Sequence, residues 1–475
     1  MNEQLWGRKI QSELDSSSIA LPALVRDRMD GVYSQLPDFA TKRANRKRIL
    51  WASACVILLL AGIFAMGFVS PAMAKVLRQI PVIGSAFQTV GDAGIQHAVE
   101  RGLASTVDQT VEDEGVAVTL DQVIYDGTRL SIGILHSSDI TILIPGSSEM
   151  IRADGREINA SMGGSTKALA DGMTATIYKF TPTEPLPERF KLDFHFNEVS
   201  MNKDGRSEKI AGNWWFTTPV VKITEGVTVT PFDPPLIREH DGIRIAVTEV
   251  TTTPLTTQVA FELVEPAMFD SMLPGREVVP KGEIVVDHRL DYELLDSNGL
   301  SLEPLSMSWS QKAGEPAKVV ALFAPVTMDV QSFTLRTIDR VDKMRSRGDG
   351  SFDGASTPQI SYAELPLDTP ISVKQGEAGE IVFKSILFEK DQTWIEYEVR
   401  GTEPYIQDGA WWLENDEGEQ YRFDRYDRTR VSQDSYDYKV KLPAIPSNES
   451  LKVAVYQIKS DERKKQLDIQ LPLNR

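Results

Sequence analysis

An uncharged apolar run at residues 49–69, ILWASACVILLLAGIFAMGFV, constrains this chain more than any other feature. At about 1.5 Å of rise per residue, a helix of this length crosses the roughly 30 Å hydrocarbon core of a bilayer. Basic residues that flank a span mark its cytoplasmic side. Five of them directly precede the run: Lys42, Arg43, Arg46, Lys47 and Arg48. We therefore predict a single-pass cell-membrane protein with residues 1–48 in the cytoplasm and the C-terminal part outside the cell.

A cleaved signal peptide is the alternative interpretation of the same run. Ala72 and Ala74 have the small-x-small spacing of a signal-peptidase site. Signal peptides, however, have a short charged region and an apolar stretch of about 7–15 residues. Both parts are longer here, which favours a retained transmembrane helix. Cleavage at Ala74, in maturation or as a regulated step, stays open.

Charge and cysteine content limit the partners of the predicted outer part. Residues 1–48 hold nine Lys and Arg against six Asp and Glu, a net charge of +3. The remaining residues therefore carry a net charge of about −20, because the whole chain has a net charge of −17. An acidic surface repels nucleic acid, which we exclude as a partner. The single cysteine, Cys55, lies in the apolar run, so no intramolecular disulfide can form. A large exported region without disulfides is more typical of a Gram-positive bacterial surface than of a eukaryotic ectodomain.

The predicted outer part contains three copies of one pattern. Each copy begins with two runs of alternating apolar and polar residues around a short polar break, at 116–135, 243–263 and 381–399. Alternation with β-branched and aromatic residues indicates half-buried strands. Each pair is followed by a Gly-containing turn (Asp154-Gly155, Asn298-Gly299, Glu417-Gly418), a strand (188–196, 331–338, 449–458) and an apolar closing strand (214–220, 363–369, 467–473).

The repeat indicates the fold class. Its period of about 105–135 residues is too long for a solenoid and suits two-sheet domains with separate cores. We predict a mainly β protein with tandem immunoglobulin-like sandwiches, one transmembrane helix and a short helical tail. One large β-domain is the alternative. The predicted domains are the cytoplasmic tail (1–48), the span (49–69), juxtamembrane helices (70–111) and three sandwiches (112–220, 221–370 and 371–475).

Apolar residues in the tail follow helical spacing. Such a stripe on an isolated helix has too few neighbours to be buried within 48 residues, and it suits docking into a partner's groove. The helix could equally lie along the membrane or pack on the first tail helix. The predicted partner-binding residues are Leu21, Val25, Met29, Val32 and Leu36.

The segment after the span, VSPAMAKVLRQIPVIGSAF at 69–87, resembles the juxtamembrane signature of a family of Gram-positive single-pass membrane proteins. Those proteins have outer domains of unassigned function and are regarded as anti-sigma-factor-like. The resemblance covers the tail, the span and the first outer domain. It implies that the tail holds a sigma factor inactive while the outer domains sense the state of the envelope. The tail lacks the His and Cys-x-x-Cys residues of zinc-type anti-sigma factors. The matching residues are Ser70, Pro71, Ala74, Pro81 and Gly84.

Motifs for catalysis are missing from the sequence. The five histidines have no metal-ligand spacing, and there is no G-x-S-x-G elbow, phosphate loop or cysteine nucleophile outside the apolar run. We therefore predict no enzyme and no cofactor other than a weak Ca²⁺ candidate. Asp349, Ser351 and Asp353 match the opening of a calcium loop, but Ile360 stands where the bidentate Glu belongs. A flexible, solvated loop is the alternative.

The third repeat is rich in aromatic residues. Ten rings fall within residues 394–438, more than one small sandwich needs for its core. Aromatic and Arg side chains anchor ligands and protein partners. An aromatic core with a few rings at the surface is the alternative. The residues predicted to form a ligand surface are Trp411, Trp412, Tyr421, Phe423 and Tyr426.

Two functions are consistent with these features. The first is a membrane regulator whose cytoplasmic helix binds a sigma factor and whose outer sandwiches sense envelope state through an unknown extracellular ligand or cell-wall component. The second is a surface-binding or structural stalk protein for which the helix is only an anchor. The apolar stripe of the tail and the family resemblance favour the first.

Overall fold

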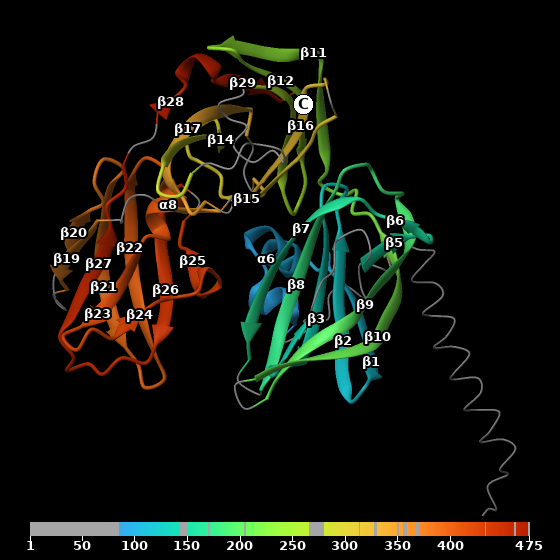
Figure 1. Ribbon diagram of the computed structural model, residues 1–475, viewed down its shortest axis with the longest axis horizontal. Coiled ribbons are helices and arrows are strands. Elements are labelled where there is room, and N and C mark those ends of the chain that lie inside the picture. The colour runs from blue at the N-terminus through green and yellow to red at the C-terminus, as the bar shows by residue number, and fades with distance from the viewer. Residues whose placement is uncertain are drawn as a thin grey trace, which may run out of the picture. The chain divides into compact units, whose positions relative to one another are not determined.

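The computed structural model describes residues 85–475, apart from 143–149, 170–171, 204–205, 266–279, 313, 327–329, 349–350, 355–358, 366–369, 433, 460–461 and 474–475. The described residues belong to one compact unit. The described part is mainly β, as predicted, and contains three two-sheet sandwiches (Figure 1). Their likeness to immunoglobulin domains stays a prediction.

The three sandwiches repeat one strand order. Each contains a five-stranded antiparallel sheet in which the strands, counted along the chain, lie in the order first, second, third, fifth, fourth. The predicted strand pairs form the second and third positions in every case, at β2–β3, β12–β13 and β21–β22. The repeat of the sequence pattern therefore corresponds to a repeat of the topology.

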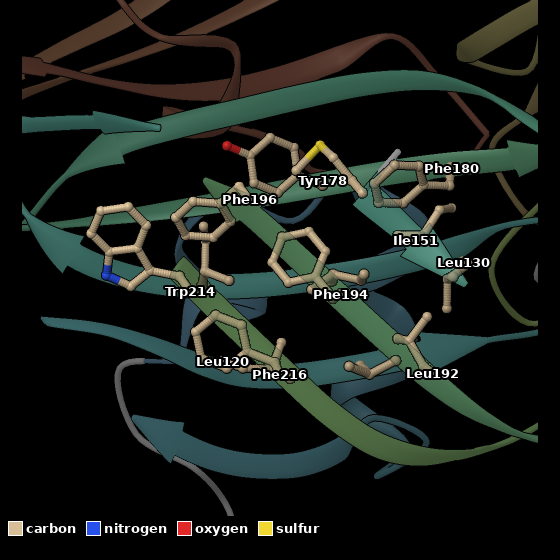
Figure 2. Packing of buried hydrophobic residues seen from close by; sticks show 14 of the residues in the cluster. Leu120, Leu130, Ile151, Tyr178, Phe180, Leu192, Phe194, Phe196, Trp214 and Phe216 are labelled. Carbon is tan, nitrogen blue, oxygen red and sulfur yellow. The ribbon is translucent and has the colours of Figure 1, made fainter. Parts of the chain in front are cut away.

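The first sandwich packs this sheet against a second one. Its five-stranded sheet consists of β1 (Ser105–Asp113), β2 (Val116–Tyr125), β3 (Leu130–Ser137), β8 (Met173–Pro182) and β7 (Ala160–Ala168). The second sheet consists of β10 (Arg206–Val221), β9 (Arg189–Lys203), β5 (Ile151–Ala153) and β6 (Arg156–Glu157), with β4 (Ile140–Ile142) also on β9. Alternate residues of β9 and β10 enter the core, where the rings of Phe196 and Trp214 stack 5.3 Å apart (Figure 2). His195, which directly precedes Phe196 and points to the opposite face of β9, stacks on the half-exposed Trp215 instead.

The second sandwich has the same five-stranded sheet. It consists of β11 (Thr228–His240), β12 (Ile243–Thr252), β13 (Thr257–Val264), β16 (Ala317–Phe323) and β15 (Pro304–Ser310). The opposing sheet centres on β17 (Ser332–Ser346), which pairs with β14 (Ile284–Leu295), β18 (Phe352–Gly354), β28 (Glu462–Arg463) and β29 (Ile469–Pro472). Phe261 and Tyr292 meet edge to face across its core.

The third sandwich follows the same plan. Its five-stranded sheet consists of β20 (Ile371–Lys374), β21 (Gly379–Phe388), β22 (Gln392–Gly401), β26 (Asp437–Pro443) and β25 (Arg428–Arg430). The opposing sheet consists of β19 (Ile360–Glu364), β27 (Leu451–Tyr456), β23 (Trp411–Asn415) and β24 (Gln420–Tyr421). Two short helices, α8 (Pro404–Asp408) and η2 (Arg425–Asp427), lie between its described strands. A third, η3 (Lys465–Leu467), buries Leu467 in the core of the second sandwich.

The second and third sandwiches exchange their closing strands, which corrects the predicted boundary at 370. In the first sandwich the closing strand β10 pairs with β9, its predecessor in the chain. The strand expected at 363–369 to close the second sandwich overlaps the end of β19, which pairs instead with β27 of the third. The last strand, β29, returns to pair with β17 of the second sandwich, and Leu471 is buried in that core. Both closing strands are short, five and four residues, so their local pattern does not indicate which sheet each one completes.

Two helices precede the first sandwich. α5 (Ala86–Val90) and α6 (Ala93–Glu100) are N-capped by the side chains of Ser85 and Asp92. They lie on the face of the five-stranded sheet that points away from the sandwich core, with Phe87 and Ile95 in a cluster of their own. The predicted helical segment therefore packs on the first sandwich where it is described. It ends earlier than expected, because β1 begins at Ser105 rather than after residue 111.

The three Gly-containing turns occur as predicted. Asp154 and Gly155 have φ values of 50° and 79° between β5 and β6, and Gly155 supplies the left-handed backbone that a tight hairpin requires. Gly299 and Gly418 also have positive φ. The positions of these turns were therefore predictable from the sequence, although the pairing of the closing strands was not.

Candidate functional site

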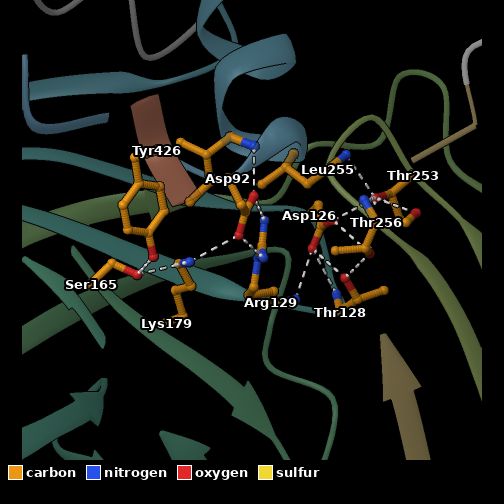
Figure 3. A network of polar contacts seen from close by, with 11 residues as sticks. Asp92, Asp126, Thr128, Arg129, Ser165, Lys179, Thr253, Leu255, Thr256 and Tyr426 are labelled. Atoms are coloured by element: carbon orange, nitrogen blue, oxygen red, sulfur yellow. Dashed lines mark hydrogen bonds and ion pairs between the residues drawn. The ribbon is translucent and has the colours of Figure 1, made fainter. Parts of the chain in front are cut away.

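The N-cap of α6 is the centre of a buried ion network. Both carboxylate oxygens of Asp92 accept from the guanidinium of Arg129, at 2.7 and 3.1 Å, and Lys179 Nζ lies 3.0 Å from Asp92 Oδ2 (Figure 3). Arg129 directly precedes β3, and Lys179 lies on β8. Side chains from these two strand regions therefore hold the start of α6. Arg129 is 1% exposed, which makes this ion pair part of the interior.

The electrostatics of Asp92 depend on these two cations. Burial alone would raise the pKa of its carboxyl group, but the charges of Arg129 and Lys179 outweigh burial and hold the pKa well below its ordinary value. Asp92 is therefore a carboxylate at neutral pH. Removing one partner would leave a buried charge uncompensated, which costs more than the intact pair contributes.

A second carboxylate joins the first and second sandwiches. Asp126, in the turn between β2 and β3, accepts from the backbone N–H of Thr128 and of Arg129 at 2.9 and 2.8 Å. Its other oxygen accepts from Thr253 Oγ1 at 2.5 Å, in the turn between β12 and β13. Thr128 and Thr256 share a further hydrogen bond of 2.7 Å between their hydroxyls. These residues are buried, so the joint is shielded from solvent.

An apolar contact accompanies this polar joint. Leu255, in the same turn, is fully buried in the cluster formed by α5, α6 and the first sheet. The backbone approaches closely here, because a Cβ on Gly94 would lie 1.9 Å from the Leu255 carbonyl oxygen. The start of α6 is therefore held between the first and second sandwiches.

The third sandwich reaches the same region through η2 and β25. Lys179 donates to Ser165 Oγ at 3.3 Å, and Ser165 hydrogen-bonds the hydroxyl of Tyr426 (Figure 3). Lys167 forms an ion pair of 2.5 Å with Asp427. Edge strand β7 of the first sandwich thus contacts η2 of the third.

The second and third sandwiches meet beside these contacts. Tyr405 donates its hydroxyl to the Ser301 carbonyl at 2.9 Å, and the Ser301 N–H donates to Tyr436 Oη at 2.6 Å. Arg428 forms an ion pair of 3.0 Å with Glu303 and a second one with Asp408. Burial raises the pKa of Tyr405 well above its ordinary value, so its hydroxyl stays protonated and able to donate.

A cavity of about 340 Å³ lies where these contacts converge. α6 lines it with Gln96 and His97, and the second sandwich with residues 300–303. The third sandwich lines it with polar or aromatic groups: Tyr405, Tyr426, Arg428, Thr429, Arg430 and Tyr438. The volume lies at the lower end of the range for small-molecule pockets. Because α6 and the second and third sandwiches all contribute to its wall, this cavity is the candidate functional site.

The predicted aromatic surface is largely wrong. Trp411, Trp412 and Tyr421 are buried, so they offer no ligand surface. Trp411 packs edge to face on Tyr397 in the core between the two sheets. Its neighbour Trp412 points to the opposite face of β23, where Arg422 covers its ring at 4.2 Å.

The other two predicted rings lie closer to the surface. Phe423 is half-buried and packs on Trp411, with ring centroids 4.8 Å apart. Tyr426 is half-buried and lines the cavity. Most of the aromatic excess therefore belongs to the core of the third sandwich, and only Tyr426 of the five residues reaches the candidate site.

The calcium candidate stays untested. Asp349 lies outside the described residues, and Asp353 forms an ion pair with Arg347. Within the described ranges no three His, Cys, Asp or Glu side chains gather as a metal site.

The predicted partner-binding residues Leu21, Val25, Met29, Val32 and Leu36, like the predicted span at 49–69, lie outside the described residues and stay predictions. In the part of the chain that is described, no helix is long and apolar enough to cross a membrane.

The buried network was not found from the sequence. Asp92 carries a recognisable signal, since an Asp directly before a helical segment is a preferred N-cap. Arg129 and Lys179 look like ordinary strand-end and strand residues, and nothing in the local pattern pairs them with Asp92. Tyr405 and Arg428, which line the cavity, also have no sequence signal that identifies them as site residues.

A family model matches part of this chain. Residues 42–138 match the model of a domain of unknown function, DUF4179. No curated protein matches the chain. A solved structure of a conserved domain protein from Bacillus anthracis is 14% identical and covers 55% of this chain and 81% of its own, with a TM-score of 0.40.

Two further structures match more weakly. Titin domains I67–I69, in an E-to-A mutated variant, are 8% identical over 72% of this chain and 91% of their own, with a TM-score of 0.11. A marsupial T cell receptor is 7% identical over 74% of this chain and 98% of its own, with a TM-score of 0.13. Overlaps this low assign neither fold nor function to the chain.

Proposed function

We propose that this chain is a single-pass regulator of the cell membrane, anti-sigma-factor-like, with its N-terminus in the cytoplasm and its C-terminus outside. The cytoplasmic helix binds a sigma factor through its apolar stripe. The outer immunoglobulin-like sandwiches sense the state of the envelope by binding an extracellular ligand or cell-wall component. The chain is not an enzyme and takes no cofactor in this role.

The position of α6 is the observation that carries the proposal. Along the chain, α5 and α6 are the first described elements after the apolar run at 49–69. Asp92 at the start of α6 is held by Arg129 and Lys179, and the wall of the cavity includes Gln96 and His97 from the same helix. A ligand that changes how the three sandwiches meet therefore acts on the helix that leads toward the membrane segment.

A non-signalling stalk is the second candidate, and the exchanged strands favour it. Because β19 and β29 cross between the second and third sandwiches, those two domains are joined through backbone hydrogen bonds as well as side chains. A rigid, disulfide-free support for a surface protein would have such a joint. In that role the tail has no partner.

Capture from native cells distinguishes the two functions. The tagged full-length chain is expected to retain a sigma factor, and Met29→Asp is expected to lose it because a charge interrupts the apolar stripe. Ser34→Asp, which adds the same charge off the stripe, is the matched control and is expected to retain it. A sigma-dependent reporter should rise with Met29→Asp alone. Equal capture and equal reporter output for both variants would contradict the regulator and leave the stalk.

A further inference from the structure

The strand β19 is an open edge of the third sandwich. It is the terminal strand of its sheet and pairs with β27 alone among the described strands (Figure 1). Its register with β27 is uninterrupted, and the strand contains no Pro, Gly or Lys. The edge strand β11, in contrast, carries Pro231, Pro234 and Pro235 and has an irregular register. Proteins use such devices to keep other strands away from an edge, so β19 is open to strand addition.

The backbone of β19 offers alternate hydrogen-bonding groups on its open side. Gln359 and Leu365, which flank the strand, form backbone hydrogen bonds with residues at the two ends of β27. Bonded residues alternate along an antiparallel ladder, so the odd-numbered residues of this segment face β27. The N–H and C=O groups of Ile360, Tyr362 and Glu364 therefore point away from β27.

The outer face of this edge is nearly neutral in an acidic molecule. Tyr362 and Ile360 are 52% and 40% exposed, and Tyr456 of β27 lies beside Ile360. Glu364 is the only charged residue of β19, and its carboxylate lies 3.9 Å from Lys452 Nζ. Two copies of a chain whose part outside the N-terminal tail carries about −20 repel each other over most of their surfaces. A neutral edge is where a second copy can approach.

The sequence of β19 is complementary to itself in an antiparallel arrangement. About a twofold axis that passes through Tyr362 perpendicular to the sheet, Tyr362 lies opposite Tyr362 of the second copy, and Ile360 lies opposite Glu364. These are the residues whose backbone groups point outward, so every outward N–H meets a carbonyl. The exposed tyrosine rings then form an aromatic cross-strand pair, a kind of contact that stabilises antiparallel sheets.

We propose that β19 pairs with β19 of a second copy of this chain and joins the two third sandwiches in one continuous sheet. Strand addition of this kind takes its affinity mainly from main-chain hydrogen bonds. A twofold interface uses the same patch on both copies, so association through β19 stops at a dimer. The pairing goes beyond the proposed function and is compatible with the regulator and with the stalk.

Disulfide trapping of the full-length chain in cells tests the pairing. Cys55→Ser removes the single native thiol, so cross-links come from introduced cysteines alone. Tyr362→Cys is expected to form a disulfide dimer on mild oxidation before lysis. The Cα atoms of such an opposed pair lie about 5.5 Å apart, which a disulfide can bridge. Leu387→Cys, at a side chain that is 53% exposed on β21, is the control of matched exposure and should give about tenfold less dimer.

A mixed experiment tests the register. Chains with Ile360→Cys and chains with Glu364→Cys, carrying different tags, are expected to cross-link with each other but not with themselves. Two copies of the same residue would be four positions apart along the paired strands, or about 13 Å, which is beyond the reach of a disulfide.

Proline at the centre of the strand tests the backbone hydrogen bonds. Tyr362→Pro removes an N–H that points away from β27, so β19 stays in its own sheet. Both copies lose their hydrogen bond at the axis, and the cross-link between Ile360→Cys and Glu364→Cys is expected to fall about tenfold. Tyr362→Ala in the same background keeps the N–H and is the matched control, which should retain most of the cross-link.

Several results would overturn the pairing. One is equal dimer from Tyr362→Cys and Leu387→Cys in chains expressed at the wild-type level, and another is equal cross-linking of the proline and alanine variants. Self-cross-linking of Ile360→Cys at the yield of the mixed pair would contradict the register. A disulfide from Tyr362→Cys to a different protein would assign the edge to that protein instead of a second copy. Capture of a sigma factor is measured separately, through the tail.

Discussion

The two joints between neighbouring sandwiches are built differently. The first and second sandwiches meet through side chains of two turns, chiefly Asp126, Thr253 and Leu255. The second and third share exchanged strands, so the backbone of β29 completes a sheet in the domain that precedes it. A side-chain joint can be weakened by one substitution, whereas a strand-exchanged joint is inseparable from the folding of both domains.

Removing the last strand should have the largest effect. A chain that ends after Lys465 loses Leu467, Ile469 and Leu471, which are at most 1% exposed in the core of the second sandwich. Each large-to-small core change costs about 2–5 kcal/mol, so losing all three costs about as much as the whole stability of a typical domain. Hydrogen exchange should show lost protection in β14 and β17, while β8 and β9 keep theirs.

A chain that ends after Leu473 is the control for this truncation, and it is expected to exchange like wild type. If protection were lost in β22 and β26 of the third sandwich while β14 and β17 stayed protected, the strand exchange would be wrong. The order of strands along the sequence assigns residues 467–473 to the third sandwich. It therefore predicts that the truncation removes protection from β22 and β26 rather than from β14 and β17.

Leu255→Ala should weaken the side-chain joint alone. Leu255 is fully buried among α5, α6 and the first sheet, and its truncation is expected to cost about 2–4 kcal/mol. Denaturant unfolding of the full chain measures this loss, and protease cleavage near residues 253–256 should increase while the cores of the sandwiches stay protected. Leu387→Ala, at a side chain that is 53% exposed, is the control and should change stability little. Equal effects of the two substitutions would mean that Leu255 does not hold the joint.

The smallest expected effect is the pH dependence of the ion network. The pKa of Asp92 is lowered in the folded protein from its ordinary value of 3.8, so its stabilising contribution is complete above about pH 4. That contribution is lost as the pH falls below about 4 toward the folded pKa. The difference in unfolding free energy between wild type and Asp92→Asn should therefore shrink between pH 4 and pH 2. A constant difference over that range would show that Asp92 is not held by Arg129 and Lys179.

Much of the local structure was predictable from particular residues. The alternation at 116–135, 243–263 and 381–399 identified the central strand pairs, and Gly155, Gly299 and Gly418 identified turns. Each of these signals is local, because it involves residues only a few positions apart. Period-two alternation indicates directly which face of a strand is buried. The mainly β class and the threefold repeat follow from them.

The candidate site was far less predictable. Tyr426 was identified only as part of an aromatic surface that is mostly core, since a run of rings does not reveal which of them face inward. Asp92 and Arg129 are 37 residues apart in the chain, and Ser165 and Tyr426 are 261 apart. Contacts over such separations leave no local periodicity, so nothing in the sequence of either partner indicates the other.

The sequence by itself determined the kind of elements this protein forms: an apolar run long enough to span a bilayer, an acidic remainder, and three repeats of alternating strands joined by Gly turns. The tertiary structure alone decided which sheet each closing strand completes and which charges meet at α6. The physical reason is that strand edges with the same alternation offer interchangeable backbone donors and acceptors. Only the packing of complete domains selects between them.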